Sequence, residues 1–211
     1  MKLLRYLFVI LLISGIVWGV QHQDQLKGAV NTTALMKQFT PLQQAAVGNH
    51  QHTSTRALAN HALYYTPETN PERVDVPLIN KIESGHIDAA FYSFTDRPTA
   101  EALVAAANRG VKVRIYRDQQ QFEEEHSRNS SVTDMFAGNQ NVQIRVKGSH
   151  DLMHLKAWAT EGLLRDGSSN VSAAAKHQDN SVILSSNNEE ITAFEDKFES
   201  MWDRSDNVVI Q

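Results

Sequence analysis

Hydrophobic positions recur with two different periods between residues 61 and 204, and these periods predict the elements of one folded domain. Short apolar or alternating stretches that we expect to be strands are 61–65, 86–94, 111–117, 142–146, 156–160 and 180–184. Apolar residues spaced three or four apart predict helices over 74–84, from Pro98 to Gly110, and after Asn187 or Asn188. Residues 122–136 fit a loose helix or a loop, and 162–167 fit a hairpin return. Strands that alternate with helices favour an α/β fold.

Details within these stretches refine the expected packing. The run 86–94 is largely apolar, so we expect a central strand there. Pro77 suits the first turn of the helix predicted over 74–84. The strand 180–184 is expected to be the last one. The buried stripe of the final helix is expected to consist of Ile191, Phe194, Phe198 and Met201 or Trp202.

The two ends of the chain differ from this pattern. Lys2 and Arg5 precede an uncharged apolar run over residues 6–20, which is typical of a secretory signal peptide and short for a membrane span. We therefore expect residues 1–20 to be a signal peptide or an N-terminal membrane anchor, and the protein to be exported: periplasmic or secreted, or attached to the membrane. Residues 21–60 are polar and are expected to be a linker, and 205–211 a tail.

Composition excludes several classes of protein. The 211 residues include no cysteine, which rules out disulfides, thiolate metal sites and a cysteine nucleophile. The net charge of −4 argues against a surface that binds phosphates over a long stretch, although it does not bear on a single pocket. Basic residues on or near strand edges that could guide a nucleic-acid backbone are Lys112, Arg114, Arg117, Arg145 and Lys147.

The candidate chemistry is concentrated between residues 153 and 170. His154 and Lys156 are two positions apart, so on an extended strand both side chains would lie on the same face. A nucleophile or proton carrier would then stand beside a fixed positive charge, as cleavage of a phosphodiester requires. A small Gly-Ser-Ser-Asn turn follows at 167–170.

These segments resemble the H-x-K-x4-D…G-S-x-N signature of the phospholipase D superfamily. His154, Lys156, an acid at Glu161 in place of Asp, and the turn 167–170 occur in the order of the signature. The flanking segments 90–95 and 105–113 are also similar to that family, so the resemblance covers roughly residues 61–204. It implies a phospholipase D-like mixed β-sheet with helices on both faces and one motif per chain, as in the small EDTA-resistant endonucleases and related phospholipase D-like proteins.

The resemblance also implies a two-step mechanism without metal or other cofactor. One histidine attacks phosphorus and forms a phosphohistidine, and a second protonates the leaving oxygen. Site residues carried over are His154 as nucleophile or acid, Lys156 and Asn170 as ligands of the nonbridging oxygens, Ser168 as a further hydrogen-bond donor, and Glu161 as a supporting acid. Asp179 lies where small members carry an acid that holds the other nitrogen of the histidine ring.

A single chain supplies only half of such a site. None of the other eight histidines is followed two positions later by lysine, and no internal repeat occurs. The resemblance therefore implies a homodimer in which the motifs of two copies meet across a two-fold axis.

Other interpretations remain open at this stage. His150 to His154 imitates the zinc motif H-E-x-x-H with Asp for Glu, but that motif requires a helix where the pattern predicts a strand. The substrate is expected to be a nucleic acid, DNA or RNA. The alternatives are a phospholipase D-type enzyme that hydrolyses or transfers lipid head groups, and an inactive binding module of the same fold.

Overall fold

The computed structural model describes residues 56–58, 60–149 and 151–211, and every structural statement below concerns that part of the chain. The expected signal peptide or anchor at 1–20, and the linker up to residue 55, lie outside the described residues. His150 does so too. Among the described residues, none of the helices has the length and hydrophobicity that a bilayer crossing requires.

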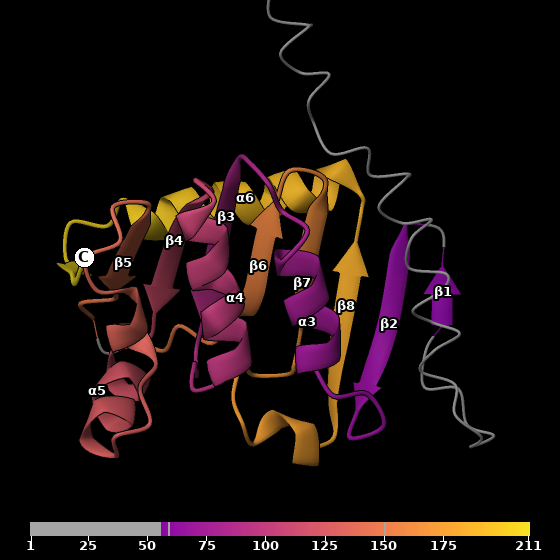
Figure 1. Ribbon diagram of the computed structural model, residues 1–211, viewed down its shortest axis with the longest axis horizontal. Coiled ribbons are helices and arrows are strands. Elements are labelled where there is room, and N and C mark those ends of the chain that lie inside the picture. The colour runs from indigo at the N-terminus through magenta and orange to yellow at the C-terminus, as the bar shows by residue number, and fades with distance from the viewer. Residues whose placement is uncertain (1–55, 59, 150) are drawn as a thin grey trace, which may run out of the picture. The chain divides into compact units, whose positions relative to one another are not determined.

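Nine strands of the described chain form one mixed sheet with the order β1-β2-β8-β7-β6-β3-β4-β5-β9 (Figure 1). The strands are β1 Arg56–Leu58, β2 His61–Thr66, β3 His86–Phe91, β4 Lys112–Arg117, β5 Val142–Val146, β6 Lys156–Thr160, β7 Leu163–Gly167, β8 Asn180–Ser185 and β9 Val208–Val209. Strands β3, β4 and β5 are parallel, while β6, β7 and β8 pair antiparallel. The apolar strand β3 lies between β4 and β6, so its central position is confirmed.

Helices cover both faces of this sheet. They are α3 Glu72–Ile79, α4 Arg97–Asn108, α5 Gln119–Ser127 and α6 Asn188–Trp202, with 3-10 turns at Thr133–Phe136 and Ala175–His177. Figure 1 shows α3 and α4 in front of the sheet and α6 behind it. Side chains alternate accordingly along β6: Ala157 and Ala159 pack in the α6 core, whereas the Trp158 indole reaches Asp75 of α3. The expected α/β sheet with helices on both faces is confirmed.

Capping residues fix where the helices begin. The Asp96 carboxylate accepts a hydrogen bond from the Thr99 N–H at 3.0 Å, with Pro98 in the first turn, and so begins α4 as expected. Asn187 caps α6 through the Glu189 N–H at 2.9 Å. The predicted stripe of α6 is buried from Ile191 to Trp202.

Several expectations were wrong in detail. Pro77 lies inside α3 rather than in its first turn, where its missing N–H removes the helical bond to the Arg73 carbonyl. The helix ends at Ile79 instead of 84. The expected tail 205–211 contains β9, which pairs with β5, so the strand at 180–184 is not the last one. The expected linker up to residue 60 includes β1, which pairs with β2.

A buried ion pair joins α3 to β7. The Arg165 Nε lies 3.2 Å from Asp75 Oδ1, and both side chains are at most 1% exposed. The Trp158 Nε1 donates to the same carboxylate oxygen at 3.0 Å. Asp75 therefore satisfies two buried donors on two strands, which locks α3 onto the sheet.

Replacing Asp75 with alanine is expected to lower the free energy of unfolding by about 3–5 kcal/mol, because the Arg165 charge is left buried without a partner. Urea unfolding followed by circular dichroism measures this loss. Asp196→Ala, on the exposed face of α6, is the matched control and should change stability by less than about 0.5 kcal/mol. Equal effects of the two substitutions would contradict the role given to Asp75.

Candidate active site

The register of the strands brings the candidate residues to one end of the sheet. Lys156 begins β6 opposite Phe91, the last residue of β3, and Gly167 ends β7 opposite Val182 of β8. The carboxyl ends of the parallel strands, the start of β6 and the loop between β7 and β8 therefore meet at the lower end in Figure 1. Open α/β sheets commonly bind their ligands at the carboxyl ends of the strands.

His154 and Lys156 lie against one aromatic ring, that of Tyr92. The His154 ring meets the Tyr92 ring edge-on with centroids 4.4 Å apart, and the Lys156 Nζ lies 4.7 Å from the centroid of the same ring. The Lys156 Nζ also donates a hydrogen bond to the His154 carbonyl at 2.6 Å. His154 precedes β6 instead of belonging to it, so the two residues are neighbours through Tyr92 and this hydrogen bond rather than through a shared strand face.

The environment of the two side chains sets their charge. Burial lowers the pKa of His154, the nearby Lys156 charge lowers it further, and Asp118 opposes both. Burial lowers the pKa of Lys156 to about 8, while Asp118 and Asp166 act in the opposite direction. At neutral pH the imidazole of a single chain is therefore neutral and able to act as a nucleophile, and Lys156 keeps its positive charge.

A buried arginine couples this pair to the Gly-Ser-Ser-Asn turn. The Arg165 Nη1 donates to the carbonyl of Lys156 at 2.5 Å and to the carbonyl of Ser169 at 3.1 Å. The chain beyond the turn is fixed by the segment after β3, where the Thr95 N–H donates to the Val171 carbonyl at 3.0 Å. Asn170 therefore lies between the turn that contains Ser168 and the segment that follows β3, and hydrogen bonds fix both of these segments.

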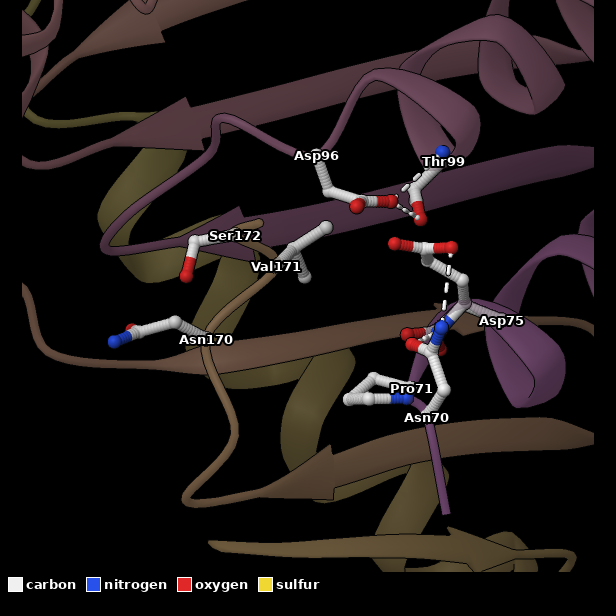
Figure 2. A pocket seen from close by; sticks show the side chains of 9 residues that line it. Asn70, Pro71, Asp75, Asp96, Thr99, Asn170, Val171 and Ser172 are labelled. Carbon is white, nitrogen blue, oxygen red and sulfur yellow. Dashed lines mark hydrogen bonds between the residues drawn. The ribbon is translucent and has the colours of Figure 1, made fainter. Parts of the chain in front are cut away.

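The hydrogen bonding of Asn170 is incomplete within the described chain. Its side-chain oxygen is buried and has no hydrogen-bond partner among the described residues. A buried polar atom without a partner costs about 1–3 kcal/mol, so such atoms are often found where a ligand binds. Figure 2 shows the Asn170 amide extending away from Asp75, Asp96 and Thr99, which converge around a cavity of about 10 Å³. The unpartnered atom is an acceptor, so it would receive a hydrogen bond from a ligand, whereas the Nδ2 group is the donor of this amide.

Ser168 and Asp179 lie at the same end of the sheet but beside a different hollow. The Ser168 hydroxyl accepts a hydrogen bond from the Ser181 N–H at 2.9 Å and lies 3.3 Å from the Asn180 side-chain oxygen. Both Ser168 and Asp179 are exposed and line an open hollow of about 460 Å³. The structure contains no hydrogen bond between the described side chains of Asp179 and His154, so the role expected for Asp179 stays a prediction.

Glu161 lies at the opposite end of β6 from Lys156, in the turn that leads to β7. Its carboxylate packs against Gly85, where an added Cβ would come within 3.1 Å of Oε1. Gly85 also has a φ of +85°, which favours glycine. The structure therefore does not place Glu161 near His154 and Lys156. The supporting role expected for Glu161 would have to act through the turn between β6 and β7.

Most of the basic residues expected to guide a nucleic acid are engaged within the fold. Arg114 pairs with Asp88 and Glu199, and the fully buried Arg117 pairs with Glu125. The remaining ones also contact the fold: Arg145 lies over the Trp202 ring and donates to its carbonyl, Lys147 donates to the Asp151 carbonyl, and Lys112 donates to Asn141. Arg114 and Arg145 therefore face α6 and Arg117 faces α5, and of the five only Lys112 is exposed, so these residues do not form a basic track along the strands.

The structure does not form the helix that the zinc interpretation of residues 150–154 requires. Residues 151–155 form no helix, so the spacing that would place two histidines on one helical face is not realised there. In the described ranges, no three His, Asp or Glu side chains lie close enough together to hold a metal ion.

Two residues of the site were not singled out from the sequence. Tyr92, which contacts both His154 and Lys156, directly follows β3, and Asp118 directly follows β4. Both therefore stand at the carboxyl end of a parallel strand, which is the signal that marks them. An exposed histidine and a buried lysine at this end of a mixed sheet are the arrangement that the resemblance to the phospholipase D superfamily predicts.

Comparison with known proteins agrees with this resemblance. The family described as "Cardiolipin synthase, PLD-like domain" matches residues 78–202, and the chain belongs to this phospholipase D-like family. None of the curated protein sequences compared with the chain matches it.

Similar solved structures share the fold. Nuc from Salmonella typhimurium, described as a phospholipase D family member, has a TM-score of 0.62 at 22% identity, over 72% of this chain and 97% of Nuc. NucT from Helicobacter pylori has a TM-score of 0.60 at 22% identity, over 70% of this chain and 97% of NucT. The phosphatidylserine synthase from Haemophilus influenzae has a TM-score of 0.50 at 12% identity, over 71% of this chain and 40% of the synthase.

Proposed function

We propose that this protein is a metal-independent phosphodiesterase that acts as a nuclease, through a phosphohistidine formed on His154. The observation that carries the proposal is the pairing of the exposed His154 imidazole with the buried Lys156 ammonium group against the Tyr92 ring. An imidazole nucleophile must be neutral, and the phosphate it attacks must be held by a positive charge. His154 and Lys156 meet these two requirements side by side.

The chemistry proceeds in two displacements. A ring nitrogen of His154 attacks phosphorus, the phosphorus–oxygen bond to the leaving group breaks, and the protonated His154 of a second copy gives its proton to the leaving oxygen. That second imidazole, now neutral, then takes a proton from water while the water oxygen attacks phosphorus and the phosphorus–nitrogen bond breaks. One difficult displacement is thereby divided into two easier ones.

Lys156 and Asn170 would stabilise the charge that gathers on the nonbridging oxygens. The Lys156 Nζ has one hydrogen bond to the His154 carbonyl, which leaves further N–H donors for a phosphate. Arg165 links the backbone of Lys156 to that of Ser169, the residue before Asn170, and the Nδ2 group of Asn170 is the donor that would reach the phosphate. Donors already positioned where negative charge develops are usually the largest contribution to such catalysis.

The second histidine is proposed to come from an identical chain. The chain has one His-x-Lys motif, and it matches Nuc and NucT over 97% of their length but the phosphatidylserine synthase over 40% of its length, which supports one half-site in each copy. Leu152, two residues before His154, is 54% exposed, and an apolar side chain beside the half-site suits contact with a second copy.

Mixing wild-type chains with an equal amount of His154→Ala chains tests this dimer. After subunit exchange, activity per wild-type chain should fall to about half, since about half of the wild-type chains then belong to mixed dimers that hold one histidine. Light scattering should report a dimer before and after mixing. Full activity of the mixture, or of a monomer, would contradict a shared site.

A nucleic acid is the proposed substrate because the chain matches the compact Nuc and NucT structures over nearly their full length. The experiment is incubation of the purified protein with plasmid DNA, RNA and mixed phospholipid vesicles, with and without EDTA. Cleavage of DNA or RNA that persists in EDTA is the expected result. Loss of activity in EDTA that zinc restores would overturn the metal-independent mechanism.

The description of the matching family as a cardiolipin synthase domain favours one second candidate, a phospholipase D-type enzyme. Release or transfer of lipid head groups without nucleic-acid cleavage would establish that function instead. Absence of both activities, together with binding of a nucleic acid or lipid, would indicate an inactive module.

A further inference from the structure

The carboxylate of Asp118 connects the end of β4 to the loop that carries His154. Asp118 is 3% exposed, and its Oδ2 accepts a hydrogen bond from the Met153 N–H at 2.9 Å. Its Oδ1 accepts a hydrogen bond from the Gln121 N–H at 3.1 Å and so caps α5. One buried side chain therefore fixes the backbone immediately before His154.

The charge of Asp118 also acts on the three side chains of the half-site, which are His154, Lys156 and Tyr92. Burial is the largest influence on the pKa of His154 and on that of Lys156, and it lowers both. The charge of Asp118 opposes this effect at both residues, and Asp166 also opposes it at Lys156. The pKa of Tyr92 is raised first by burial and then by the charges of Asp118 and Glu124. Asp118 is therefore the one acid that acts on all three members of the half-site in the described chain.

The cation next to Asp118 in the sequence is engaged elsewhere. The Arg117 Nη2 pairs with Glu125 at 2.5 Å, and its Nε donates to the Phe91 carbonyl at 2.9 Å. The other oxygen of Glu125 accepts a hydrogen bond from the Phe94 N–H at 2.9 Å. The Asp118 charge also acts on the buried Arg117, but no ion pair to Asp118 within 4 Å is found in the described part of the chain, so no direct contact neutralises it.

We propose that Asp118 is a positioning residue of the half-site, whose buried carboxylate holds the His154 loop in place through the Met153 N–H and supplies a negative charge that acts on His154 and Lys156. The inference rests on the proposed function. In the dimer one His154 must be protonated to act as the acid, whereas burial and the Lys156 charge both disfavour that form. The negative charge of Asp118 offsets them without contacting the substrate.

Asp118→Asn tests the inference, and Asp96→Asn is its matched control. Asp96 is also a buried N-cap, at the start of α4, but its side chain contacts Thr99 and no residue of the half-site. In Asp118→Asn we expect kcat to fall about 10²-fold, as for a misplaced catalytic group. We also expect both limbs of the pH–rate profile to move to lower pH. Asp96→Asn should move neither limb.

A measurement independent of activity separates this inference from the proposed function. NMR titration of the histidine ring protons, with the His154 signal assigned from His154→Ala, should give a lower pKa for His154 in Asp118→Asn than in the wild type. An unchanged His154 pKa, or a loss of activity that is equal at every pH, would overturn the inference. If the wild type shows no cleavage that depends on His154, the proposed function fails, while the titration still decides what Asp118 does.

Folding of the variant is checked by urea unfolding. Asparagine can accept only one of the two N–H groups that Asp118 binds, so some loss of stability is expected. Asp118→Ser keeps a capping oxygen for α5 while removing the charge, and it takes the place of Asp118→Asn if that variant is unfolded. The same shift of the His154 pKa is expected in either variant.

Discussion

Replacing His154 with alanine should abolish phosphodiester cleavage, with a loss of at least about 10⁴-fold. In a symmetric dimer this one substitution removes the nucleophile from one copy and the acid from the other. The exposed imidazole packs against the Tyr92 ring and makes no side-chain hydrogen bond within the described chain, so the fold should survive. Cleavage assays, with circular dichroism of the same sample, measure both results.

The matched control removes a histidine from the far end of the same sheet. His86 begins β3 and lies 3.5 Å from Glu195 of α6, away from the half-site. His86→Ala should retain nearly full activity. Cleavage that survives in folded His154→Ala would refute the phosphohistidine mechanism, and equal losses in both variants would show that the assay follows stability rather than chemistry.

The core of the fold could be predicted from the sequence because each central element carries a local signal. The apolar run of β3, the alternation in β4 and the cap of α6 at Asn187 are such signals, and each element lies where its pattern indicates. The edges could not be predicted in this way. Val208–Val209 pairs with β5 only because the chain returns across the sheet after α6, and two residues carry no periodicity of their own.

The candidate site was only partly visible in the sequence, for a related reason. A motif names residues that are close together in the chain, such as His154 and Lys156, but not the residues that hold them. Tyr92 reaches the pair from the end of β3 and Asp118 from the end of β4, and only the sheet topology brings these ends together. Likewise the motif includes Glu161, which the length of β6 carries to the opposite end.

Replacing Lys156 with methionine should reduce kcat by about 10²–10³-fold, the usual effect of removing one donor to a developing oxyanion. Methionine is close to lysine in length and suits a position that is 5% exposed, so packing against Tyr92 is kept while the charge and the bond to the His154 carbonyl are lost. Lys197→Met, on the exposed face of α6, is the matched control and should keep its activity.

The pH dependence of substrate binding shows whether Lys156 acts through its charge. Because burial lowers its pKa to about 8, the ammonium loses its proton as the pH rises through 8, well before an exposed lysine would. In a His154→Ala background, where cleavage is removed, the affinity for a fluorescent oligonucleotide should therefore fall above pH 8. With Lys156→Met added, affinity should be low already at pH 7 and lack this step. A step at pH 8 that persists in the double variant would assign it to another group and remove Lys156 as the phosphate ligand.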